Sequence, residues 1–186
     1  MNLLSRPNRR IPRAPAVDRL RAQDGVTLIE TIVATGILLV AMSGLVSIAF
    51  VATTTTENQG HLAARTTEYA QDKMEQLLAL TYADATSDTT AFPATPAGGT
   101  GLAVGGNLPP AAPVNGYVDY LDVNGNLLGG GNAAPATWYY RRVWKVELPA
   151  GSTNLKQITV TTSVKWSMGN TALPISTVAA LKSWPF

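Results

Sequence analysis

An uncharged segment near the N-terminus limits what this chain can fold into. From 31 to 52 the sequence contains 22 residues without a charge, and apolar side chains would cover every face of a helix formed there. Such a helix is about 33 Å long, which is enough to cross the roughly 30 Å hydrocarbon core of a membrane. The segment is longer than the roughly 7–15-residue core of a secretory signal peptide, and no A-x-A-like cleavage site closes it. We therefore predict a membrane-spanning helix.

The charge distribution predicts how this helix is oriented. Residues 1–25 contain six arginines against two aspartates, a net charge of +4. The other 161 residues contain eight lysines and arginines against ten acidic residues, a net charge of −2. Positively charged flanks of a membrane helix stay on the cytoplasmic side. We therefore expect a cytoplasmic N-terminus and a head domain on the opposite side of the membrane.

The composition excludes several kinds of chemistry. The chain has no cysteine, which excludes disulfides, thiolate metal sites and a cysteine nucleophile. Its single histidine, His61, leaves little material for a histidine-based catalytic triad or a histidine-rich metal site, and no G-x-S-x-G motif is present. We expect neither an enzymatic activity nor a cofactor.

A short motif stands between the basic segment and the apolar run. It reads Asp24-Gly25-Val26-Thr27-Leu28-Ile29-Glu30. A carboxylate at the edge of a membrane helix is costly when it is unpaired, so Glu30 is a candidate functional residue.

The basic leader, this motif and the long apolar run together closely resemble the N-terminal signature of type IV prepilins. The resemblance implies that a prepilin peptidase cuts between Gly25 and Val26 and methylates the new N-terminus at Val26. It also implies that Glu30 pairs with the N-terminus of a neighbouring subunit in a filament. The chain has Val26 where the family usually has phenylalanine, and Ser47 where many major pilins have a proline.

Helical periodicity resumes after the polar stretch at 53–56. Residues at i, i+3 and i+4 spacing form one stripe, namely Leu62, Thr66, Ala70, Met74 and Leu77, with charged residues on the other side. We expect one continuous helix from Thr27 to about Leu80, with Gly60 as the place for a bend. The segment 69–84 resembles the corresponding helix end in minor pilins of the V-type pilus-modification class and in I-type pseudopilins.

The remaining sequence predicts a loop followed by strands. Residues 85–116 are rich in Gly, Pro, Ala and Thr, which predicts a long surface loop without a core of its own. Residues 138–148 and 155–166 alternate as strands do, and Asn124-Gly125 predicts a hairpin turn. Arg142 interrupts an apolar strand face and needs a partner. The segments 138–146 and 155–166 also resemble the sheet of those minor pilins.

The expected fold class is α+β, a pilin fold with the long N-terminal helix packed on an antiparallel sheet of about four strands, one face buried and one face wet. The chain then divides into a cleaved leader at 1–25, a membrane or filament-core helix at 26–53, an amphipathic helix at 54–84, a loop at 85–116 and a sheet domain at 117–186.

Two further chemistries have partial signals. Asp122, Asn124 and Asn126 imitate the start of a Ca²⁺ loop to which Asp119 could add a ligand, although an Asn-Gly turn explains the same residues without a metal. Six cations of the sheet segment could form a strip for DNA, although they fit ordinary solvent-facing strand positions better. They are Arg141, Arg142, Lys145, Lys156, Lys165 and Lys182.

The resemblance predicts a minor structural subunit of a type IV pilus, held first in the bacterial inner membrane with a periplasmic head and then in the filament. Its partners would be the prepilin peptidase, other pilin subunits, the inner-membrane assembly platform and membrane lipid. A minor pseudopilin of a type II secretion system is the first alternative, and genome neighbours would separate the two. A filament-tip module that binds DNA or a surface is the second.

Overall fold

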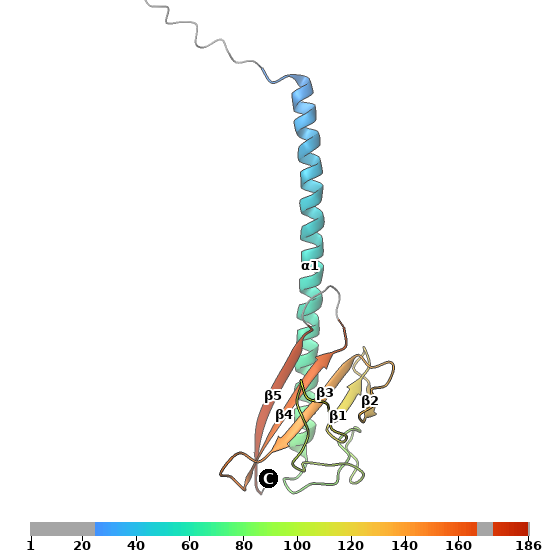
Figure 1. The fold of residues 1–186 in the computed structure, drawn as a ribbon, viewed down its shortest axis with the longest axis vertical. Helices are drawn as coiled ribbons and strands as arrows, with labels where there is room; N and C mark the ends of the chain where they lie inside the picture. The colour runs from blue at the N-terminus through green and yellow to red at the C-terminus, as the bar shows by residue number, and fades with distance from the viewer. Residues whose placement is uncertain (1–24, 167–172, 186) are drawn as a thin grey trace, which may run out of the picture. The chain divides into compact units, whose positions relative to one another are not determined.

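The computed structural model describes residues 25–166 and 173–185, so the leader residues 1–24 lie outside the described part (Figure 1). Two compact units are present, one ending at Ile48 and one beginning at Ala49. In chain order the elements are α1 (Leu28–Ala79), β1 (Val118–Leu121), β2 (Leu127–Gly130), β3 (Tyr140–Glu147), β4 (Leu155–Val164) and β5 (Ile175–Ser183).

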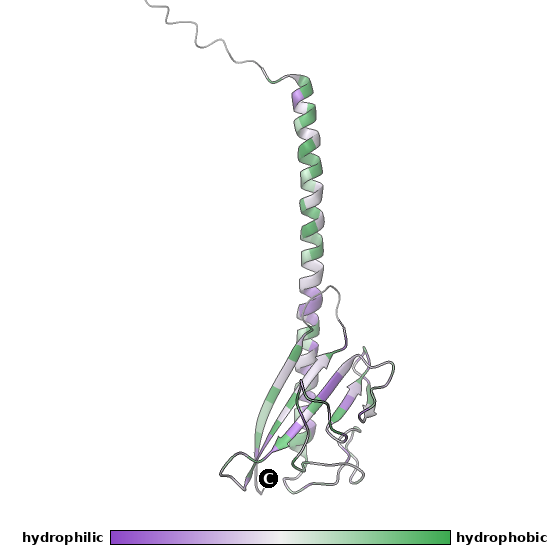
Figure 2. Ribbon diagram, viewed as in Figure 1, coloured by the Kyte–Doolittle hydropathy of each residue, from purple (hydrophilic) through white to green (hydrophobic). Residues whose placement is uncertain are grey.

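The first unit contains the apolar half of α1. The backbone N–H of Glu30 donates to Thr27 Oγ1 at 3.3 Å, which caps the start of the helix. Large apolar side chains are exposed from Val26 to Val51. This half of the helix is mostly green, the colour of hydrophobic residues, in Figure 2. By length and composition α1 can cross a membrane, as the sequence predicts.

The helix continues through the polar stretch that follows. The hydroxyl groups of Thr53, Thr54, Thr55 and Thr56 donate to backbone carbonyl groups one turn earlier, at 2.8–3.1 Å. These bonds satisfy the hydroxyl groups locally, so the threonines do not break the helix. Gly60 also lies within the uninterrupted helix, so no helix break accompanies the bend expected there.

The second unit contains an antiparallel sheet of five strands in the order β2-β1-β3-β4-β5, rather than the four strands expected. The additional strand is β5, which pairs with β4 from Ile175 to Ser183. Small and apolar residues occur on both faces of β5, so its sequence shows no polar–apolar alternation. Only the burial of its side chains alternates. When β5 pairs with β4, every second residue is partly buried and the residues between are exposed.

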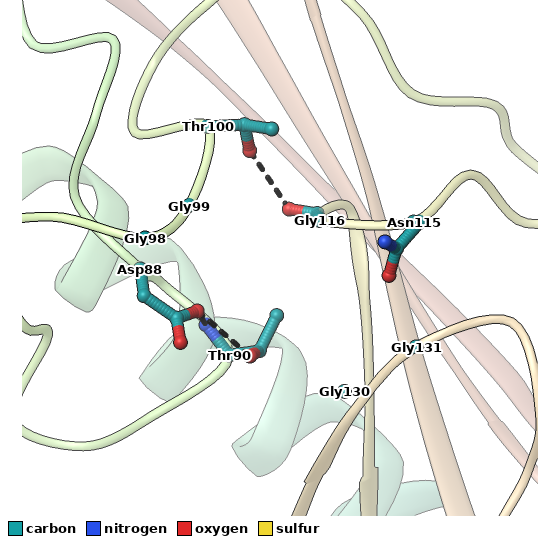
Figure 3. Close-up of a pocket in the computed structure, with 9 residues that line it drawn as sticks. All are labelled: Asp88, Thr90, Gly98, Gly99, Thr100, Asn115, Gly116, Gly130 and Gly131. Carbon is teal, nitrogen blue, oxygen red and sulfur yellow. Dashed lines mark hydrogen bonds between the residues drawn. The ribbon is translucent and has the colours of Figure 1, made fainter.

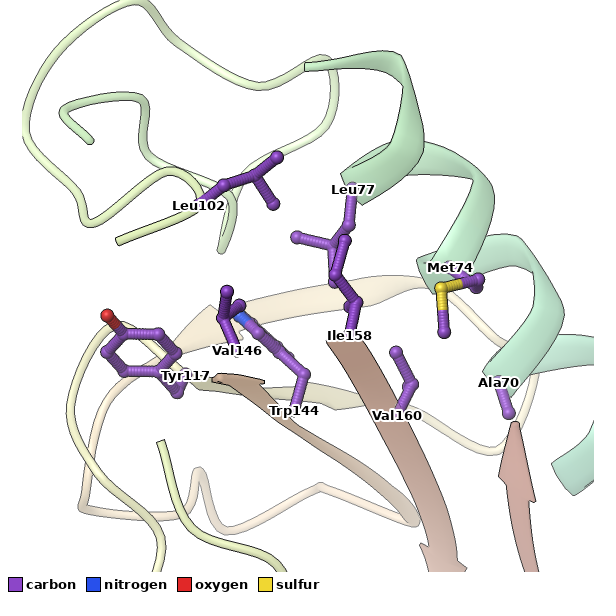
Figure 4. Close-up of a cluster of buried hydrophobic side chains, with 9 residues drawn as sticks. All are labelled: Ala70, Met74, Leu77, Leu102, Tyr117, Trp144, Val146, Ile158 and Val160. Atoms are coloured by element: carbon purple, nitrogen blue, oxygen red, sulfur yellow. The ribbon is translucent and has the colours of Figure 1, made fainter. Parts of the chain in front are cut away.

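The helix stripe predicted from periodicity packs on this sheet. Leu62, Ala70, Met74 and Leu77 are buried, and three of them join the main core with residues of β3 and β4 (Figure 4). Leu62 instead lies in a second apolar cluster, which contains Leu121, Tyr140 and Val164.

The opposite face of the sheet is not uniformly wet, contrary to the expectation. Val118, Tyr120 and Val143 are buried there because Leu108 and Trp138 pack over them. Leu108 comes from the long loop, whose apolar residues therefore cover part of this face.

The loop at 85–116 also contributes to the main core, although its composition predicts that it stays on the surface. Leu102 is fully buried in the core between the helix and the sheet. Its glycines permit close backbone contacts, since a Cβ on Gly99 would lie 2.3 Å from Asp88 Cα. The Gly-rich composition therefore serves tight packing of backbone on backbone here.

Candidate functional site

The N-terminal motif lies at the start of α1. Gly25 and Val26 precede the helix, and Glu30 belongs to its first turn with an exposed side chain. Within the described residues, the carboxylate of Glu30 has no hydrogen-bond or ion-pair partner. A Cβ on Gly25 would meet no atom within 4 Å, so packing in this part of the chain does not require a glycine there.

A buried ion cluster joins the helix to the sheet. Arg142 Nε and Nη2 donate to the two carboxylate oxygens of Asp119 at 2.7 and 2.9 Å, and Lys73 Nζ lies 2.8 Å from Asp119 Oδ2. The side chains of Lys73 and Asp119 are fully buried. Arg142 Nη1 also donates to Asp72, whose side chain is about half exposed. The partner that Arg142 needs is therefore Asp119, supported by Asp72.

Burial and charge act in opposite directions on the two cations. Burial lowers the pKa of Lys73, and the attraction of Asp119 offsets only part of this effect. Burial would also lower the pKa of Arg142, but Asp119 and Asp72 outweigh it and raise that pKa. Lys73 Nζ further donates to the backbone carbonyl of Thr89 and lies 4.2 Å from the centre of the Trp144 ring. The cluster thus connects α1, β1, β3 and the long loop.

Two cations assigned to the possible DNA strip have a different role. Lys156 Nζ donates to the carbonyl groups of Tyr82 and Leu102 at 2.7 Å each, and Lys182 Nζ donates to that of Leu78 at 2.8 Å. The last turn of α1 contains no basic residue of its own. Lys182 therefore caps the negative end of the helix dipole, and Lys156, its partner across β4 and β5, binds carbonyl groups just beyond the helix and in the loop.

The six cations therefore do not all contribute to one strip that could bind DNA. Arg142 is buried, whereas Lys145 forms an ion pair with Glu147, and Lys165 Nζ lies 5.3 Å from the ring centre of Trp138. The expectation that these residues occupy ordinary solvent-facing positions is wrong for Arg142 and Lys156, because both side chains reach inward to acceptors of α1 or the loop.

The Ca²⁺ candidate residues form a hydrogen-bonded turn between β1 and β2. Asp122 Oδ1 accepts from the backbone N–H groups of Asn124 and Asn126 at 2.8 Å, and Asp122 Oδ2 accepts from the Asn126 side-chain amide at 2.9 Å. These bonds lower the pKa of Asp122, and the bond from the Asn126 side-chain amide has the largest effect. Asp119 cannot join these residues as a ligand because both of its oxygens bind buried cations. These residues therefore form the turn that Asn124-Gly125 predicts, and calcium binding there stays the untested alternative.

A small polar cavity of about 210 Å³ lies between the long loop and β2 (Figure 3). Its lining includes Asp88, Thr90, Thr100, Asn115 and the backbones of five glycines. Thr90 Oγ1 donates to Asp88 Oδ1 at 2.7 Å, so part of the carboxylate is already satisfied. The sequence does not reveal this cavity, because its walls are mostly backbone atoms from segments that are distant along the chain.

The comparisons with known proteins add no relative. No family model, no curated protein and no solved structure matches this chain.

Proposed function

We propose that this chain is a minor structural subunit of a type IV pilus, held in the bacterial inner membrane until it joins the filament. The observation that carries the proposal is the prepilin-type motif from Gly25 to Glu30 at the start of an apolar run. The helix supports it, since α1 combines an apolar half that can cross a membrane with a half that packs on a sheet.

Cleavage after Gly25 gives the first residues of the motif a function. Among the residues that the structure describes, no atom lies within 4 Å of a Cβ built on Gly25, so packing there gives no reason for a glycine. A residue without a side chain suits a scissile position, because the backbone can enter a protease cleft closely. Removal of residues 1–25 changes the net charge from +2 to −2 and leaves an α-amine at Val26 beside the membrane helix.

Glu30 is the proposed partner of such an amine on a neighbouring subunit. An isolated ion costs several kcal/mol when it is removed from water, and pairing it with an opposite charge offsets much of that cost. The pair would fix the axial position of one subunit against the next. Within the described residues the carboxylate of Glu30 has no hydrogen-bond or ion-pair partner, so it is available for this contact.

The first experiment is N-terminal mass spectrometry of the cellular protein, in the presence and absence of the prepilin peptidase. We expect a chain that starts at Val26 when the peptidase is present and an uncleaved leader when it is absent. A mature chain with any other N-terminus would contradict the proposal.

The second experiment compares Glu30→Ala with Glu57→Ala, which removes an exposed glutamate further along the same helix. We expect Glu30→Ala to abolish incorporation into filaments, measured by copurification with sheared pili, while cleavage at Val26 and the amount in the membrane stay unchanged. Glu57→Ala should be incorporated normally. Equal incorporation of both variants would refute the role of Glu30.

A further inference from the structure

Strand β5 forms one edge of the sheet, and among the described residues only β4 pairs with it (Figure 1). The two strands pair over nine consecutive residues of β5 without a register shift. A long, regular edge is a template for another extended chain, and proteins usually shorten, bend or charge such an edge to prevent this. The outer side of β5 is therefore a candidate interaction surface.

The hydrogen bonds to β4 show which backbone groups of β5 point outward. The backbone N–H of Trp184 donates to the carbonyl of Asn154 at 2.9 Å, so these two residues form a hydrogen-bonded pair. Such pairs alternate along an antiparallel ladder. The even-numbered residues of β5 therefore bond to β4, and the odd-numbered residues direct their N–H and C=O groups away from it. We name this outward row the β5 edge, and it consists of Ile175, Thr177, Ala179, Leu181 and Ser183.

Neither charge nor irregular pairing protects the β5 edge. Lys182 is the only charged residue of β5, and its Nζ donates to the carbonyl of Leu78 on the helix side. The strand at the other edge of the sheet, β2, has only four residues, and its register against β1 shifts after Tyr120. The long loop also borders β2, since a Cβ on Gly130 would lie 2.5 Å from Thr90 Cβ. The two edges of the sheet thus differ, and only β5 presents a long, regular one within the described residues.

The sequence of β5 is complementary to itself when a second copy runs antiparallel. If Ala179 lies opposite its own copy, every outward residue of one strand meets an outward residue of the other. Lys182 then lies opposite Ser176, and the two copies of Lys182 stay about 20 Å apart. Ile175 and Leu181, which are 59% and 61% exposed, become diagonal neighbours across the pair. This register therefore joins apolar side chains and separates the like charges.

We propose that the β5 edge is an interface between two copies of this chain, whose β5 strands pair antiparallel about a twofold axis. Each strand contributes five outward N–H groups, so the pair can form ten backbone hydrogen bonds. A second copy is the occupant because it carries the same open edge and matches it residue by residue. The axis is perpendicular to the sheet, so the helix segments packed on the two sheets run in opposite directions. The contact is thus distinct from the packing of parallel subunits in a filament, and it does not rest on the proposed function.

The experiment cross-links the full chain in detergent micelles with a short bis-maleimide. The chain has no cysteine, so an introduced cysteine is its only thiol. In Ala179→Cys the two thiols lie opposite each other, with Cα atoms about 5.5 Å apart. Ile175→Cys is the matched control, because it lies on the same face of the same strand but about 26 Å from its own copy. We expect a covalent dimer from Ala179→Cys and a monomer from Ile175→Cys.

A second pair of variants tests whether backbone hydrogen bonds hold the two copies together. Added to Ala179→Cys, Thr177→Pro removes an outward N–H, whereas Thr177→Val keeps it. Both substitutions remove the hydroxyl group that lies 3.0 Å from Thr161 Oγ1, so they differ mainly in the backbone. Proline is tolerated on an edge strand where its missing N–H would face solvent. We expect Thr177→Pro to abolish the covalent dimer and Thr177→Val to preserve it.

Three results would overturn the proposal. Equal cross-linking of Ala179→Cys and Ile175→Cys would mean that the copies meet in no fixed register, for instance through their apolar helices. The absence of a dimer from Ala179→Cys would mean that the β5 strands do not pair. A dimer that survives Thr177→Pro, in a chain that near-ultraviolet circular dichroism shows to be folded, would exclude backbone pairing. If that variant is unfolded, the two single cysteine variants decide.

Discussion

Asp119 is the carboxylate on which two buried cations depend, so Asp119→Asn is a direct test of the ion cluster. The substitution preserves the shape of the side chain and removes its charge. The amide keeps one acceptor oxygen, but among the described residues Lys73 then has no carboxylate partner, and Arg142 has only the half-exposed Asp72.

The structure indicates how large the effect should be. Asp119 accepts three contacts from cationic nitrogen atoms at 2.7–2.9 Å, and its side chain is fully buried. Removing one partner from a buried ion pair costs about 3–5 kcal/mol. We therefore expect a loss of this size in the free energy of unfolding, and a decrease in Tm on the order of 10 °C.

Replacing Lys73 as well should restore part of this stability, because Lys73→Met removes one of the cations left without a partner. We therefore expect the double variant, Asp119→Asn with Lys73→Met, to be less destabilised than the sum of the two single variants. A strictly additive result would show that Lys73 and Asp119 are not coupled.

The assay is thermal unfolding of the full chain in detergent micelles, followed by near-ultraviolet circular dichroism. Glu68→Gln is the control, since it breaks an exposed ion pair with Arg65 and should cost less than about 1 kcal/mol. A loss for Asp119→Asn no larger than that of the control would refute the reasoning, because it would mean that solvent screens the cluster.

Three further predictions test other parts of the head. Lys182→Met removes the 2.8 Å bond to the carbonyl of Leu78 at the end of the helix and should cost about 1–2 kcal/mol in urea unfolding; no change would mean that this lysine does not cap the helix. Burial raises the pKa of Tyr140 to about 12 from its ordinary 10.0, so its stabilising contribution is complete below pH 10 and is lost as the pH rises toward 12. Tyr140→Phe should therefore flatten the decline of Tm over that range, and an unchanged decline would contradict this assignment. Gly99→Ala should cost about 1–3 kcal/mol because its Cβ would lie 2.3 Å from backbone, whereas Gly60→Ala, in open space within the helix, should raise stability by about 0.5–1 kcal/mol.

Periodicity was sufficient to predict which face of the helix packs on the sheet. Leu62, Ala70, Met74 and Leu77 follow the 3.6-residue repeat, and all four are buried. The repeat is a local property, so neighbouring residues along the chain are enough to reveal it. Strand β5 lacked such a signal, because apolar and small residues occupy both of its faces.

Arg142 shows where reasoning from the sequence stops. A charge on an apolar strand face must have a partner, which follows from the cost of burying it alone. The identity of that partner does not follow, because Asp119 is 23 residues away and Lys73 comes from the helix. Only the pairing of β1 with β3 and the docking of α1 bring the three charges together.

The sequence by itself determined the uncharged run, its basic flank and the motif from Gly25 to Glu30, because these features are contiguous and depend on no distant contact. The tertiary structure decided the roles of the head's charged residues. Lys182 caps the helix, and Lys156 binds the carbonyl of Tyr82 just beyond it, because β4 begins and β5 ends beside the end of α1. Such roles depend on which segments meet in space, and that is set by the free energy of the whole packed unit.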